Sequence, residues 1–142
     1  MRQVILLRTA AVTELLFAPG HLSGGLKQWS PMGGNPVLDE MTSVRFDVMG
    51  ASRSYLDFYM GFGWSLGVLM LMQAVLLWQL GSMVRTNARQ TQAMLAVITI
   101  ANLVSALLTL DFFFLVPALF SLVLIAVLVA AWIDVSRLAR RQ

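Results

Sequence analysis

The chain has 142 residues, of which 58% are hydrophobic and only 12% are charged. Soluble domains average about 45–50% apolar and about 25% charged residues, so a soluble fold of this size could not bury so much apolar surface. Cysteine is absent and His21 is the only histidine, which excludes disulfides and thiolate chemistry and argues against a zinc site or another metal site. The net charge of +3 comes from basic residues beside apolar runs, which favours a lipid bilayer as partner over nucleic acid.

Four apolar segments predict an all-α fold, an integral membrane four-helix bundle forming a single transmembrane domain. The expected spans are residues 4–22, 58–80, 90–110 and 112–133, because a helix needs about 20 apolar residues to cross a bilayer. Within the last of these, Pro117 predicts a helix start near Val116, with residues 111–115 as a turn.

The first span is the least uniform, since Arg8, Glu14 and His21 interrupt it. A signal peptide and an interfacial helix are the alternatives. We prefer a span, because Arg8 is close enough to the N-terminus for its side chain to reach the headgroups. Pro19 and Gly20 are expected to mark its far end.

Lysine and arginine are distributed unevenly between the two sides of the predicted membrane. One side holds the two termini and the loop between the second and third spans, with Arg2, Arg85, Arg89, Arg137, Arg140 and Arg141. The other side holds Lys27, Arg45 and Arg53 among several acidic residues. The positive-inside rule therefore places both termini in the cytoplasm, and we expect a bacterial inner membrane.

The connection at residues 23–53 begins with several glycines and Pro31, which indicate a loop. Asn35 followed by Pro36 is typical of a helix start, and apolar spacing predicts a short outer amphipathic helix over Pro36–Val48. Gly50 is expected to end it and Ser52 to cap the next helix. Whether this outer helix is a lid or lies on the membrane stays open.

Glu14, His21 and Asn102 are the polar candidates for a site within the spans. Glu14 and His21 are seven residues apart, so a continuous helix places them near one face, where they could transfer a proton or bind a polar headgroup. Pairing with another helix and a headgroup-level histidine are the structural alternatives. Asn102 and Gln73 are expected either to hydrogen-bond between helices or to line a polar path.

Arg53, Asp57 and Tyr59 crowd the outer end of the second span. Arg53 could hold a phosphate and Asp57 could act as a base, or the two could form only a local i, i+4 ion pair. Gly63 and Gly67 form a small-residue ridge that is typical either of a homo-oligomer contact or of packing within the chain.

Two stretches carry a family resemblance, Phe46-Asp47-Val48-Met49-Gly50 and the segment from Tyr55 to Gly63, together with Gly20-His21. They resemble small uncharacterised four-helix membrane proteins of bacteria, which are similar to DoxX-like proteins in size and topology. The resemblance implies the four-helix fold and brings no activity, cofactor or site residue with it.

We therefore expect a small multi-pass membrane protein that is not an enzyme and needs no cofactor. It would bind a lipid-like small molecule, or a membrane partner, near the outer leaflet through His21, Arg53, Asp57 and Tyr59. One alternative is a membrane isomerase or hydrolase of an apolar substrate that uses Glu14 or Asp57. Another is an oligomeric transporter or channel subunit, with Glu14 and Asn102 on its path.

Overall fold

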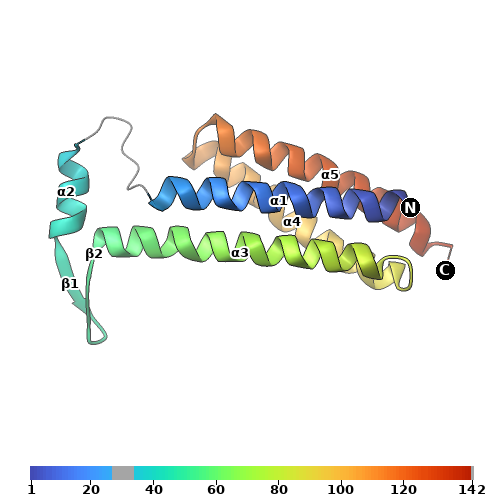
Figure 1. Cartoon of the computed structure of the whole chain (residues 1–142), viewed down its shortest axis with the longest axis horizontal. Helices are drawn as coiled ribbons and strands as arrows, with labels where there is room; N and C mark the ends of the chain where they lie inside the picture. Colours follow the sequence, from blue (N-terminus) through green and yellow to red (C-terminus); the bar gives the residue numbers. More distant parts are fainter. Residues whose placement is uncertain (27–33, 142) are drawn as a thin grey trace. The chain divides into compact units, whose positions relative to one another are not determined.

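The computed structural model describes residues 1–26 and 34–141, which form five helices and two short strands (Figure 1). In chain order these are α1 (Arg2–Leu26), α2 (Pro36–Ser43), β1 (Arg45–Val48), β2 (Ala51–Ser54), α3 (Tyr55–Met83), α4 (Ala88–Phe112) and α5 (Leu115–Ala139). By length and composition, α1, α3, α4 and α5 are each capable of crossing a membrane. Large apolar side chains are exposed along all four, which suggests a membrane location.

Two helix boundaries differ from the prediction. Helix α1 continues through Pro19 and Gly20 to Leu26. A membrane-type helix tolerates the loss of the one backbone hydrogen bond that a proline removes. Phe112 belongs to α4, and α5 begins at Leu115, so that Pro117 lies in its first turn, where a missing N–H costs nothing. The start of the predicted loop thus lies in α1, whereas its Lys27 and Pro31 lie outside the described residues.

The contacts divide the chain into two compact units. The four-helix unit comprises Met1–Leu16 and Met72–Gln142, and the hairpin unit comprises Phe17–Leu71. Segments of four helices share the core of the first unit. Its fully buried leucines come one from each of α1, α3, α4 and α5: Leu7, Leu77, Leu95 and Leu128.

The two ends of the chain meet in the four-helix unit through an ion pair. Arg2 Nε lies 3.0 Å from Asp134 Oδ2, and Arg137 Nη1 lies 3.7 Å from Asp134 Oδ1. The Asp134 carboxylate is buried and both its oxygens have a basic partner. The start of α1 and the last turns of α5 therefore lie at the same end of this unit.

The hairpin unit corrects the predicted outer helix. The start at Asn35-Pro36 is confirmed, because the Asn35 side chain accepts a hydrogen bond of 3.0 Å from Val37 N. However, α2 ends at Ser43, and Arg45–Val48 is a strand that pairs with Ala51–Ser54 in antiparallel register. The fold is therefore mostly, but not wholly, α-helical.

A two-residue turn explains this hairpin. Met49 and Gly50 connect paired residues Val48 and Ala51, with φ of 49° and 81° respectively. Positive φ at both central positions is the conformation of a type I′ turn, whose twist matches that of antiparallel strands. Glycine adopts it freely, whereas Met49 does so at some cost in strain.

Candidate functional site

The structure does not join the predicted outer cluster into one site. Among the described residues, no hydrogen bond or ion pair links His21, Arg53, Asp57 and Tyr59 to one another, although all four belong to the hairpin unit. Glu14 and Asn102 belong to the four-helix unit. His21, Arg53 and Asp57 each have hydrogen-bond partners of their own.

His21 fastens α1 to α3 within the hairpin unit. Its Nε2 lies 3.0 Å from the Gly63 carbonyl oxygen, and since a carbonyl can only accept, this nitrogen carries the proton. One turn further along α3, the Leu22 side chain packs directly on Gly67. The ridge of Gly63 and Gly67 thus contacts α1 of the same chain, and a homo-oligomer contact through it stays a prediction.

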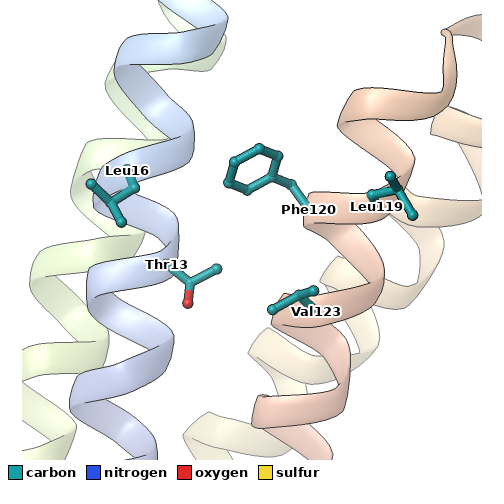
Figure 2. A pocket seen from close by; sticks show the side chains of 5 residues that line it. All are labelled: Thr13, Leu16, Leu119, Phe120 and Val123. Atoms are coloured by element: carbon teal, nitrogen blue, oxygen red, sulfur yellow. The ribbon is translucent and has the colours of Figure 1, made fainter.

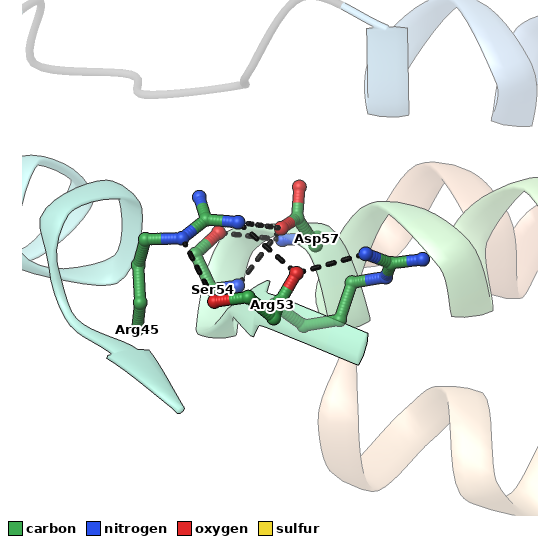
Figure 3. A network of polar contacts seen from close by, with 5 residues as sticks. Arg45, Arg53, Ser54 and Asp57 are labelled. Carbon is green, nitrogen blue, oxygen red and sulfur yellow. Dashed lines mark hydrogen bonds and ion pairs between the residues drawn. The ribbon is translucent and has the colours of Figure 1, made fainter. Parts of the chain in front are cut away.

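Asp57 is engaged at the start of α3 (Figure 3). Its Oδ2 accepts a 2.8 Å hydrogen bond from Ser54 N, and its own N–H donates to Ser54 Oγ at 3.1 Å. This reciprocal pair is a capping box, so Ser54 caps the helix in place of the predicted Ser52. Stabilising the start of α3 is therefore a sufficient role for the Asp57 carboxylate.

Arginines of the hairpin complete this network. Arg45 Nη2 lies 4.0 Å from Asp57 Oδ2 and donates to the Ser52 carbonyl at 3.1 Å. Arg53 lies in β2 and donates to the same carbonyl at 2.8 Å, as Figure 3 also shows. The predicted i, i+4 spacing of Arg53 and Asp57 on one helix is therefore wrong, because Arg53 lies in β2. Arg45 forms the ion pair, and the positive charges of both arginines act on the Asp57 carboxylate.

The tyrosine of the predicted cluster stands apart from this network. Tyr59 is 56% exposed, and within the described residues its hydroxyl has no hydrogen bond. The aromatic contacts of the hairpin involve other rings, since the Phe46 ring lies 5.1 Å from that of Tyr55 and 5.3 Å from that of Phe58. These rings pack β1 on the first turns of α3.

A string of three polar side chains, of which Glu14 is buried and Gln73 and Asn102 are half-buried, crosses the four-helix unit from α1 through α3 to α4. Gln73 and Asn102 exchange two hydrogen bonds, Nε2 to Oδ1 at 3.3 Å and Nδ2 to Oε1 at 3.0 Å. Asn102 Nδ2 also donates to the Ile98 carbonyl at 2.8 Å. The Gln73 side chain lies within hydrogen-bonding reach of the Glu14 carboxyl, which is only 3% exposed.

The string has one unsatisfied atom, Glu14 Oε2, which is buried and has no hydrogen-bond partner among the described residues. The sequence indicated an interhelical role for Asn102 and Gln73 separately. It did not indicate that they bind each other beside Glu14, because pairing between distant spans depends on how the helices pack.

A groove of about 300 Å³ lies between α1 and α5 of the same unit (Figure 2). Its lining residues are Thr13, Leu16, Leu119, Phe120 and Val123. The Thr13 hydroxyl donates to the Thr9 carbonyl at 3.0 Å, so even this polar group is satisfied within its helix. The sequence did not predict the groove, because ordinary apolar residues carry no signal that distinguishes a groove from a packed surface.

Within residues 1–26 and 34–141, no three histidine or acidic side chains come together as metal ligands would. Comparison of the chain with protein-family models, with curated protein sequences and with solved structures finds no match. The resemblance to DoxX-like proteins stays a prediction.

Proposed function

We propose that the chain is a multi-pass protein of a bacterial inner membrane, with four spans arranged as a bundle and both termini in the cytoplasm. The ion pair of Arg2 with Asp134 supports an even number of crossings, since it brings the two chain ends to one end of the four-helix unit. The Arg8 guanidinium lies 4.6 Å from the centre of the Trp78 ring, a pairing suited to the headgroup level. Arg85 and Arg89 flank the α3–α4 turn, as the positive-inside rule favours.

The function that the geometry supports best is non-catalytic binding of a lipid-like molecule, and the α1–α5 groove is the observation that carries it. Its walls are almost wholly apolar, and it begins within about two turns of the outer end of α5 in the proposed orientation. A volume of about 300 Å³ is at the lower limit of small-molecule pockets. The groove would thus hold part of one acyl or isoprenoid chain while the remainder of the molecule stays in the outer leaflet.

The enzyme alternative has less support from the arrangement of the carboxyls. Glu14 and Asp57 belong to different units, and Asp57 Oδ2 is already hydrogen-bonded in the capping box of α3. Asp57 is therefore engaged in helix capping, which leaves Glu14 as the remaining candidate for the acid or base of that alternative. Binding requires only the apolar walls that the groove provides.

The test compares two tryptophan variants on the same helix. Val123 lines the groove and Leu122 does not, yet their exposed fractions are 55% and 56%. The wild type and each variant are extracted in native nanodiscs, and the retained lipids are quantified by mass spectrometry against those of the whole membrane. We expect one lipid-like species to be enriched with the wild type and with Leu122→Trp, and to lose that enrichment with Val123→Trp.

A second pair on the opposite wall guards against misfolding of one variant. Leu16→Trp fills the groove from α1, whereas its neighbour Leu15→Trp does not. Both groove variants should lose the same lipid species while both neighbours keep it. If every sample shows only the lipid composition of the bulk membrane, the groove is filled non-specifically and the proposed function is wrong.

A further inference from the structure

The buried carboxyl of Glu14 has no basic partner in the part of the chain that the structure describes. It is 3% exposed, its Oε2 has no hydrogen bond, and no ion pair reaches it within the described residues. Asp134 shows how the same chain satisfies a buried carboxylate elsewhere, with Arg2 on one oxygen and Arg137 on the other. An isolated carboxylate in apolar surroundings is so costly that it must be neutralised.

The three polar side chains of this string lie at a similar depth. Glu14 is twelve residues after the start of α1, Gln73 is ten residues before the end of α3, and Asn102 is fourteen residues after the start of α4. At about 1.5 Å per residue, each lies roughly 15–21 Å from the end of its helix that bears the arginines. This is the middle of a bilayer whose apolar core is about 30 Å thick.

Among the described residues of the four-helix unit, no other charged group is placed at that depth. Residues 58–84 of the α3 region, 90–110 of α4 and 115–133 of α5 contain no aspartate, glutamate, lysine, arginine or histidine. On α1, Arg8 is nearly two turns away from Glu14, and its guanidinium stacks on Trp78. His21 is about two turns away in the other direction and is hydrogen-bonded to the Gly63 carbonyl. Neutralisation must therefore come from outside the chain.

We propose that Glu14, with Gln73 beside it and Asn102 hydrogen-bonded to Gln73, binds an exchangeable monovalent cation, a proton or Na⁺, in the middle of the membrane. The Glu14 carboxyl supplies the charge. The Gln73 amide oxygen accepts one hydrogen bond from Asn102 and retains a second lone pair for a cation or for a protonated carboxyl. This site is separate from the lipid groove, whose lining does not include these three residues.

A hydrophobic carbodiimide tests this proposal. The reagent reacts with a protonated carboxyl: the carboxyl oxygen bonds to the central carbon, the carboxyl proton moves to one nitrogen, and the O-acylisourea formed rearranges to a stable N-acylurea. The full-length protein in proteoliposomes is treated over a series of pH values in sodium-free buffer and again with added NaCl. Peptide mass spectrometry then measures the modified fraction of Glu14, with Asp57 and Asp134 as internal carboxyl controls.

We expect Glu14 to be modified and the two control carboxyls to remain unmodified. For a proton site, the initial rate of modification falls about tenfold per pH unit above its midpoint and is unaffected by NaCl. For a Na⁺ site, NaCl protects Glu14 in a saturable manner. Gln73→Leu should change the affinity for the proton or for Na⁺ by at least about threefold, roughly 0.6 kcal/mol. The change would be seen as a shift of the pH midpoint or of the protecting NaCl concentration. Gln79 is an exposed glutamine on the same helix, and Gln79→Leu should change neither.

Two results would overturn the proposal. Glu14 that stays unmodified at every pH without sodium would mean that a basic group of another molecule neutralises it. Modification that is independent of both pH and NaCl would mean that Glu14 is permanently protonated and does not exchange its proton with water. Because the lipid assay above uses different residues, either failure leaves the proposed lipid binding to be judged separately.

Discussion

Replacement of Gly67 by alanine probes the closest contact of the hairpin unit. A Cβ at this position would collide with the Leu22 side chain, whose Cγ would be only 2.7 Å away. A Cβ at Gly61, on the same helix, would meet no atom within 4 Å. Since both changes gain the same helix propensity, the difference between the two variants isolates the cost of overpacking, which we expect to be about 1–3 kcal/mol.

The assay is reversible unfolding in mixed micelles with increasing SDS, followed by tryptophan fluorescence. Gly67→Ala should unfold at a lower SDS fraction than Gly61→Ala, and adding Leu22→Ala to Gly67→Ala should recover most of the loss. The double variant gives a coupling free energy for the pair. Equal stability of the two alanine variants, or a loss that Leu22→Ala leaves unchanged, would refute the close packing of α1 on α3.

Three further changes test other parts of the structure. Met49→Asn should stabilise the hairpin by about 0.5–1 kcal/mol, because asparagine tolerates positive φ in a type I′ turn, and slower amide exchange across the two strands would show it. Ser54→Ala should destabilise the start of α3 by about 1 kcal/mol by removing half of the capping box with Asp57, which faster amide exchange confined to that turn would reveal. Asn102→Leu should destabilise the protein by about 0.6–2 kcal/mol in SDS unfolding because Gln73 loses both hydrogen bonds, and an unchanged unfolding curve would contradict the amide pair.

The helices were predictable where local chemistry decides the structure. Asn35 and Pro36 mark the start of α2 because an N-cap and a fixed φ act within a single turn. The strand β1 that follows α2 was not predicted. The apolar residues Val44 and Val48 are four positions apart, a spacing that places them on one face of a helix and equally on one face of a strand. Only the conformation of Met49 and Gly50 distinguishes the two.

The helix ends were less predictable than the spans themselves. The turn between the last two spans was expected to begin at Asp111, yet α4 continues to Phe112. A charged side chain at the end of a long helix can reach water without breaking backbone hydrogen bonds. The sequence indicated that Asn102 and Gln73 could bond between helices, but it did not predict which partners they would find. The sequence contains Glu14, Gln73 and Asn102, but their meeting depends on three helices packing at one depth.

The amide pair between α3 and α4 also has a consequence for how the chain reaches its structure. Its two hydrogen bonds form at a single alignment of Gln73 with Asn102, whereas the leucines and valines around them would pack nearly as well if one helix slid along the other by a turn. In hydrocarbon such a slip would leave both side-chain amides without hydrogen-bond partners, because no water is present to replace them. The pair therefore selects one register for two otherwise interchangeable apolar surfaces, and it does so as soon as the third and fourth helices of the chain meet.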